Sequence, residues 1–164
     1  MLRNTFAIAC IHARYLKLDG SYETCLVAAK SKIVSSLSIP KAELKSCTVG
    51  AILSHVCSTY LKLSNILVSN IYVTDSMVAL QWLNTDQRPL MLGIRNNVIE
   101  VRRFSEIGNW YLVQSGDNIA DLGTRQATIH DIGLKSEWQL GKKWMSLERK
   151  SFPILSIDEI KLSA

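Results

Sequence analysis

Alternating apolar and polar residues near the start of the chain predict a β-hairpin. Within the segment from Phe6 to Leu18, Ile8 and Cys10 stand two positions apart, as on the buried face of a strand. The pair Asp19-Gly20 follows, which is typical of a two-residue hairpin turn. The segment from Tyr22 to Val34 then returns as the partner strand.

The pattern becomes helical after a serine-rich stretch at residues 35–38. Pro40 is suited to the first turn of a helix, where its missing N–H would have no partner in any case. The apolar residues that follow have helical spacing: Leu44, Val49, Ile52, Leu53, Val56 and Tyr60. A helix from Pro40 to Tyr60 is therefore predicted.

A β-rich run and a second helix come next. The run extends from Asn65 to Asp75 and contains Ile66-Leu-Val and Ile71-Tyr-Val. Ser76 or Asp75 is a natural N-cap for a helix that follows. The apolar residues of that helix are Val78, Leu80, Trp82 and Leu83.

The rest of the chain repeats this order of strand and helix. Residues 88–104 are amphipathic and predict a helix, Trp110–Val113 predicts a short strand, and Asn118–Thr124 opens another helical turn. Because strands precede helices repeatedly, the pattern predicts an α/β fold.

Composition narrows the class of protein. The 164 residues suit a single domain, and 48% hydrophobic with 20% charged residues is globular composition. No apolar run is long enough for a transmembrane helix, so no membrane partner is expected. The four cysteines lack CxxC spacing and the three histidines pair with none of them, so buried reduced thiols, no structural zinc and an intracellular location, cytoplasmic or nuclear, are expected.

Three carboxylates stand where metal chemistry is often found. Asp75 ends a predicted buried strand, Glu43 lies near the start of a helix, and Asp121 follows a strand. Converging carboxylates would suit Mg²⁺, and two such ions can hydrolyse a phosphodiester. Each residue also has a simpler reading: Glu43 as a charge at a helix N-terminus, Asp75 as an N-cap, and Asp121 as a solvated loop residue.

Basic residues suggest an anionic partner. The formal net charge is +5. The candidates for phosphate contacts are Lys41, Lys45, Arg88, Arg95, Arg102 and Arg103, although basic residues at such spacing also suit a solvated helix face.

Four ordered motifs resemble one family. They are Val27-Ala-Ala-Lys30-Ser-Lys with Leu37-Ser-Ile-Pro40-Lys-Ala-Glu43-Leu44, Val73-Thr-Asp75-Ser76 with Ala79-Leu-Gln-Trp82-Leu, Asn118-Ile-Ala-Asp121-Leu-Gly-Thr-Arg125, and Trp138-Gln-Leu-Gly141-Lys-Lys-Trp144-Met with Phe152-Pro153. Together they resemble the RNase H-like segment of BEL/Pao-type retrotransposon Pol polyproteins and the stretch after it. The resemblance covers roughly residues 6 to 153 and divides the chain into an RNase H-like domain at 1–128 and a C-terminal extension at 129–164.

The resemblance implies a fold and a chemistry. The fold would be a mixed sheet flanked by helices, and the reaction a metal-dependent endonucleolytic hydrolysis of RNA in RNA/DNA hybrids. By motif match, Glu43, Asp75 and Asp121 would hold Mg²⁺ or Mn²⁺, with nucleic-acid contacts expected at Lys41, Lys45, Ser76 and Arg125. The remainder of a Pol polyprotein is a further expected partner.

The chain departs from the family pattern at its beginning. The family's first catalytic Asp, in an Asp-Ala-Ser type motif, would fall just upstream of Met1, on the central strand of the sheet. We therefore expect an N-terminally truncated, inactive domain. Its hairpin would either pair directly with the run from Asn65 to Asp75 in a new register or, as we favour, remain loosely attached with an exposed edge. The alternatives are a non-catalytic remnant that binds nucleic acid or protein, or a fragment of a longer Pol polyprotein.

Overall fold

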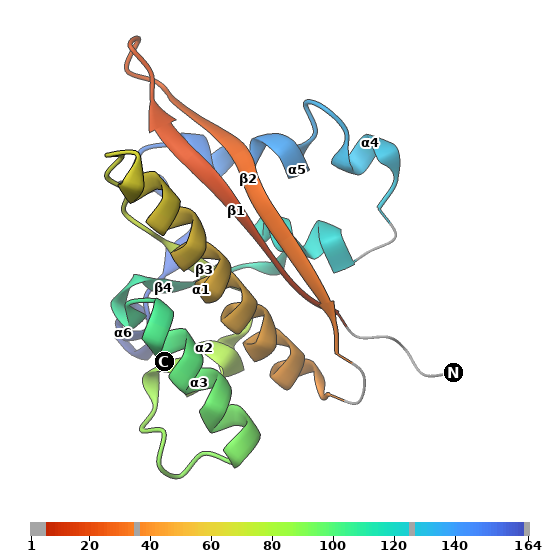
Figure 1. Ribbon diagram of the computed structural model, residues 1–164, viewed down its shortest axis with the longest axis vertical. Helices are drawn as coiled ribbons and strands as arrows, with labels where there is room; N and C mark the ends of the chain where they lie inside the picture. Colours follow the sequence, from red (N-terminus) through yellow and green to blue (C-terminus); the bar gives the residue numbers. More distant parts are fainter. Residues whose placement is uncertain (1–5, 35–36, 125–126, 163–164) are drawn as a thin grey trace.

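The computed structural model describes residues 6–34, 37–124 and 127–162, and its α/β class agrees with the prediction. Two sheets and several helices alternate along the chain (Figure 1). The hairpin forms one sheet by itself, and three later strands form the other. The single mixed sheet expected from the resemblance is thus divided in two, and only the three-stranded sheet is mixed.

The first sheet consists of β1 (Phe6–Leu16) and β2 (Tyr22–Ile33), paired antiparallel with a bulge between Ile11 and His12. The predicted two-residue turn is wrong, because β1 ends at Leu16 and residues 17–21 connect it to β2, which begins at Tyr22 as predicted. Asp19 Oδ1 accepts hydrogen bonds from the backbone N–H and the hydroxyl of Ser21, and Gly20 has a φ of 82°. The left-handed backbone at this position explains the glycine.

Helix α1 (Ile39–Leu63) lies along the hairpin. Pro40 stands in its first turn, as predicted. The approach is close at Gly50, where an added Cβ would lie 3.4 Å from the Cβ of Ala9. Ser46 Oγ accepts a 3.0 Å hydrogen bond from the Ile8 N–H. Small residues therefore let the helix and the strand approach closely.

The second sheet has the order β3–β4–β5, with β3 parallel and β5 antiparallel to β4. Its strands are β3 (Tyr72–Thr74), β4 (Trp110–Val113) and β5 (Ile154–Leu155). The β-rich run predicted from Asn65 is mostly wrong, because only its last residues pair. Asn65 has a φ of 58° and Leu67 is 94% exposed, so this stretch turns the chain out of α1 along the surface.

Short helices complete the chain. Helix α2 begins as predicted, since Ser76 Oγ accepts a 3.1 Å hydrogen bond from the Ala79 N–H. The helix predicted from Arg88 begins later, because Arg88 is held in a turn by Asp86. The bounds are α2 (Met77–Asn84), α3 (Leu92–Phe104), α4 (Ile129–Ile132), α5 (Glu137–Leu140) and α6 (Ile157–Leu162), with 3₁₀ turns at η1 (Ile107–Asn109), η2 (Ser115–Asp117), η3 (Ile119–Thr124), η4 (Lys143–Ser146) and η5 (Arg149–Ser151).

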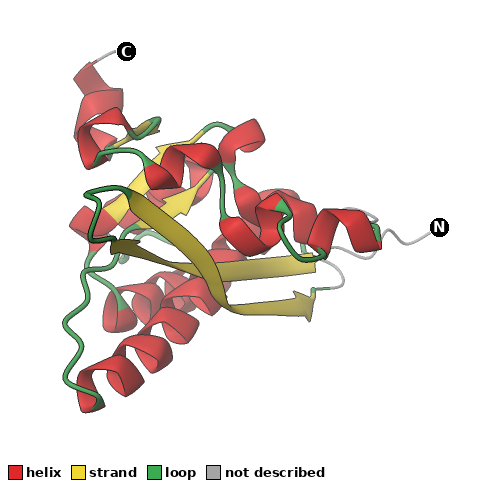
Figure 2. Ribbon diagram, turned by 90° about the horizontal axis from the view of Figure 1, so that it is seen from above, coloured by secondary structure: helices red, strands yellow, loops and turns green. Residues whose placement is uncertain are grey.

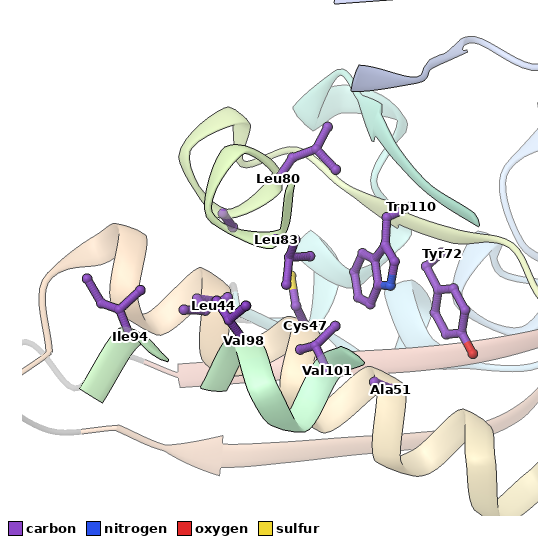
Figure 3. Close-up of a cluster of buried hydrophobic side chains, with 11 residues drawn as sticks. Leu44, Cys47, Ala51, Tyr72, Leu80, Leu83, Ile94, Val98, Val101 and Trp110 are labelled. Carbon is purple, nitrogen blue, oxygen red and sulfur yellow. The ribbon is translucent and has the colours of Figure 1, made fainter. Parts of the chain in front are cut away.

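The main core lies between α1, α2, α3 and one face of the three-stranded sheet (Figure 3). Tyr72 and Trp110 stack in it with ring centroids 4.8 Å apart. Its buried members are Leu44, Cys47, Ala51, Tyr72, Ala79, Leu80, Leu83, Ile94, Val98, Val101 and Trp110. A smaller cluster of Val113, Trp144 and Ile154 covers the other face.

The C-terminal segment holds the hairpin from the side opposite α1. Arg14 donates to the carbonyl oxygens of Met145 at 2.8 Å and Leu147 at 2.6 Å. His12 Nε2 lies 2.9 Å from the Trp138 carbonyl oxygen. Helical segments therefore stand on both sides of the hairpin (Figure 2), which pairs with no described strand of the other sheet; its loose attachment stays a prediction. The division at residue 128 stays a prediction.

Two further expectations concern membrane-spanning helices and the cysteine thiols. No helix among the described residues is both long and apolar enough to cross a membrane. The four cysteines carry free thiols, as expected, but Cys25 is exposed, so burial of all four is wrong.

Candidate functional site

Asp75 stands at the carboxyl end of β3, as the sequence predicts, and both of its carboxylate oxygens accept hydrogen bonds. Ser115 Oγ donates to Oδ2 at 2.7 Å, and Asn118 Nδ2 donates to Oδ1 at 3.0 Å. Because β3 and β4 are parallel, the segment that follows β4 begins at the same edge of the sheet as Asp75. This topology brings the two donors, which are 40 and 43 residues away in sequence, to the carboxylate.

The segment from Ser115 to Asn118 is itself well held. Asn118 Oδ1 accepts a 3.1 Å hydrogen bond from the Ala120 N–H, which turns the Asn118 amide nitrogen toward Asp75. Trp144 Nε1 donates to the Asp117 carbonyl oxygen at 3.2 Å. The carboxylate of Asp75 therefore belongs to a network that reaches the C-terminal segment.

A surface pocket of about 570 Å³ opens beside Asp75. It is lined by Asp75, Leu112, Val113, Gln114, Ser115, Asp117, Pro153 and Leu155. Asp117, which is not among the predicted site residues, shares this pocket with Asp75. Its position just after a strand parallel to β3 was the signal that could have identified it.

Glu43 on α1 and Asp75 after β3 both act electrostatically on one buried thiol, that of Cys47. The prediction placed Glu43 in the first turn of its helix. The helix begins at Ile39, so Glu43 lies in the second turn. Burial raises the pKa of Cys47 to about 12, and the charges of Glu43 and Asp75 add to the rise. Both carboxylates are thus close enough to Cys47 to affect its titration.

Asp121 lies in η3, a segment packed against β1. Its backbone N–H donates to the Asn118 carbonyl oxygen at 3.3 Å, and its own carbonyl oxygen accepts from Thr124 Oγ1 at 2.9 Å. Gly123, two residues further on, lies against Ile8, where an added Cβ would be 3.0 Å from Ile8 Cδ1. Along the chain, Asp121 follows three residues after Asn118, which donates to Asp75.

The three predicted ligands do not form a metal centre where the structure describes them. Over residues 6–34, 37–124 and 127–162, no three His, Cys, Asp or Glu side chains are grouped closely enough to hold an ion. Both oxygens of Asp75 already accept from neutral donors. A divalent cation needs several converging oxygen ligands. The residues as placed do not fit Mg²⁺ or Mn²⁺.

The predicted nucleic-acid contacts have different surroundings. Lys41 and Lys45 are half-buried and lie one turn apart on α1, and Lys45 Nζ is 3.1 Å from Asn97 Oδ1 of α3. Ser76 is buried, and its hydroxyl caps α2. Arg125 lies outside the described residues. Of the four, only the two lysines present charge on a described surface.

Of the other basic candidates, Arg88, Arg102 and Arg103 have protein partners. Arg102 donates to the carbonyl oxygens of Leu83 and Thr85 and so closes the end of α2. Arg88 pairs with Asp86, and Arg103 lies 4.0 Å from Glu100. By contrast, neither Lys41 nor Lys45 pairs with a carboxylate among the residues that the structure describes.

Residues 3–76 match the family of the Pao retrotransposon-like RNaseH-like domain. The match confirms the resemblance over this segment, which contains Glu43 and Asp75 but not Asp121. No curated protein and no solved structure matches the chain. An RNase H-like family in general suggests a nucleic-acid partner.

Proposed function

We propose that this Pao retrotransposon-like RNase H-like chain binds nucleic acid through phosphate contacts on α1, without a hydrolytic metal centre of its own. One observation carries the proposal. Within the segment that matches the family, Lys41 and Lys45 stand on one side of α1 with charges that no described carboxylate pairs.

The surroundings of Lys45 support this role. Asn97 Oδ1 accepts from Lys45 Nζ at 3.1 Å and from Thr48 Oγ1 at 3.0 Å. A neutral amide positions the ammonium group but leaves its charge uncompensated, so a phosphate oxygen would gain the full Coulomb attraction. The net charge of +5 favours approach of the same ligand.

Hydrolysis is the part of the family's chemistry that these residues do not support. In that family, Mg²⁺ or Mn²⁺ held by carboxylates would supply the activated water. Asp75 accepts from Ser115 and Asn118 instead, and the described residues gather no third ligand. We expect the purified chain to cleave an RNA/DNA hybrid no faster than Asp75→Asn, with Mg²⁺ or Mn²⁺ present.

The binding test uses fluorescence anisotropy with a labelled RNA/DNA hybrid over a range of salt concentrations. Binding should be largely independent of sequence and should weaken steeply with salt, because phosphate contacts release counterions. Replacing both Lys41 and Lys45 by Gln should weaken binding several-fold at low salt and reduce the slope of log K against log salt by about 2.

A matched control removes the same charge elsewhere. Lys150 and Lys161 lie in the C-terminal segment, paired with Glu148 and Asp158. The double Gln variant of these two should keep the wild-type salt slope. Equal losses in the two double variants, or affinity that salt leaves unchanged, would refute contacts at α1.

Protein binding is the second candidate, and one feature of α1 favours it. Ile52, Val56, Tyr60 and Leu63 follow helical spacing and are 38% to 76% exposed. Substituting Tyr60 by Ser should leave nucleic-acid affinity unchanged. A salt-insensitive association that this substitution abolishes would favour protein binding.

A further inference from the structure

We infer that the Asp75 carboxylate is a structural fastener, which attaches the segment after β4 to the end of β3. The inference does not depend on nucleic-acid binding, because it concerns only how Asp75 is used within the fold. It gives the residue a role different from the metal ligand that its motif suggests.

Each oxygen of the Asp75 carboxylate accepts a hydrogen bond from the segment after β4. Oδ2 accepts from Ser115 Oγ at 2.7 Å and Oδ1 accepts from Asn118 Nδ2 at 3.0 Å. Hydrogen bonds to an ionised acceptor are about twice as strong as those between neutral groups. Each oxygen therefore holds one end of a four-residue segment, and the two bonds together fix its position.

The Asn118 side chain is oriented for this contact. Its Oδ1 accepts from the Ala120 N–H at 3.1 Å, so its Nδ2 is the group that faces Asp75. A bound cation would need an acceptor at this place, whereas the amide presents a donor. The local backbone thus favours a carboxylate bonded to protein over a carboxylate bonded to metal.

The fastened segment also connects to the C-terminal part of the chain. The Asp117 carbonyl oxygen accepts from Trp144 Nε1 at 3.2 Å. Trp144 is buried with Val113 and Ile154, and its ring lies edge-on to Phe152 at 5.0 Å. Asp75 therefore links β3, the turn after β4 and the segment that carries β5.

The two roles predict opposite signs for the change in stability. If Asp75 fastens the turn, Asp75→Asn replaces an ionised acceptor of two hydrogen bonds by an amide with a single oxygen acceptor, so the two charge-assisted bonds are lost or weakened and the protein is destabilised. If Asp75 belongs to a cluster of carboxylates kept for a cation, neutralising it relieves repulsion and stabilises the metal-free protein.

The experiment compares melting temperatures of the metal-free full chain at neutral pH. Asp75→Asn should lower Tm by about 3–8 °C, from the usual scaling for a domain of this size. Glu43→Gln is the matched control, because it removes the same charge from a residue of α1 that makes no described hydrogen bond to the 115–118 segment, and it should shift Tm by less than about 2 °C. An unchanged or higher Tm for Asp75→Asn would overturn the inference.

A double-mutant cycle covers the case in which Asp75→Asn fails to fold. Ser115→Ala and Asn118→Ala each remove one donor and should each lower Tm, and the loss for the pair should be smaller than the sum of the two if they act through one carboxylate. Additive losses would contradict a shared fastener.

Titration with Mn²⁺ provides a second measurement. Millimolar Mn²⁺ should leave the wild-type Tm unchanged, since an ion that binds only the folded state would raise it. A rise in the wild type that Asp75→Asn abolishes would show a metal ligand and refute the fastener.

Discussion

The two sheets contact α1 in different ways. Toward the three-stranded sheet, the helix contributes Leu44 and Cys47 to a core of large buried side chains that includes Trp110. Toward the hairpin, the contact is made by small residues, with Ala7 packed against Ala42 and Gly50 beside Ala9. Small residues allow close approach but bury little apolar area, so they contribute less to the free energy of unfolding.

Hydrogen bonds and a cation–π contact add to the attachment of the hairpin. Arg14 bonds two carbonyl oxygens of the C-terminal segment, and its guanidinium lies 3.3 Å from the Tyr22 ring centroid. Thr24 Oγ1 donates to the Leu140 carbonyl oxygen nearby. The comparison shows that one sheet depends on packing volume and the other on a few directed bonds. Different substitutions should therefore disrupt each of them.

The largest effect is expected in the core of large side chains. Trp110→Ala removes a buried ring stacked on Tyr72 and leaves the Ser105 hydroxyl without its indole donor. It should lower the free energy of unfolding by about 3–5 kcal/mol, measured by urea denaturation. Leu67→Ala is the control, because Leu67 is almost fully exposed, and it should change stability by less than about 0.5 kcal/mol. A small loss for Trp110→Ala would contradict the conclusion that packing of large side chains stabilises the three-stranded sheet.

A smaller and more local effect is expected at the hairpin. Arg14→Gln should cost about 1.5–3 kcal/mol, since two carbonyl oxygens lose a charged donor. Amide hydrogen exchange should accelerate at residues 143–152 while α3 stays protected. Arg88→Gln serves as the control, because Arg88 is exposed and bonds only Asp86. Uniform acceleration across the chain would mean that the hairpin and the core unfold together.

The smallest effect is a pH dependence of stability where the hairpin contacts the C-terminal segment. Burial lowers the pKa of His12 below its ordinary value of 6.5, against an opposing rise from the hydrogen bond to the Trp138 carbonyl oxygen. The unfolded chain therefore takes up the proton first, and stability should fall as pH drops below about 6.5 until the folded-state pKa is reached. Denaturation midpoints over this range should show a slope that His12→Gln reduces. A slope of the opposite sign would mean that His12 is charged in the fold.

Local features were predicted well where one residue decides the outcome. Pro40 stands in the first turn of α1 and Ser76 caps α2, because helix ends depend on the groups within one turn of them. The strand predicted from Asn65 was too long, because β propensity does not tell whether a neighbouring strand is present to pair. The hairpin connection was predicted too short, since β1 ends at Leu16 and Lys17 already belongs to the turn, where its carbonyl oxygen accepts from the Gly20 N–H.

The candidate site was predicted in part. The position of Asp75 at a strand end follows from the pattern of apolar residues, and the structure agrees. Its partners were missed. Asn118 opens one of the ordered motifs, but nothing in the sequence pairs it or the distant Ser115 with Asp75. Asp117 was not among the predicted site residues, although β4 places it at the edge of the sheet where β3 ends.

The sequence by itself determined the order of strands and helices, their caps, the RNase H-like resemblance and the positive charge. These depend on residue type and spacing over a few positions, or on ordered motifs. Only the tertiary structure decided that the sheet divides in two, that Arg14 joins the hairpin to the C-terminal segment, and that Asp75 bonds Ser115 and Asn118. Those outcomes depend on which distant backbones pack together, and the free energy of such contacts cannot be read from either partner alone.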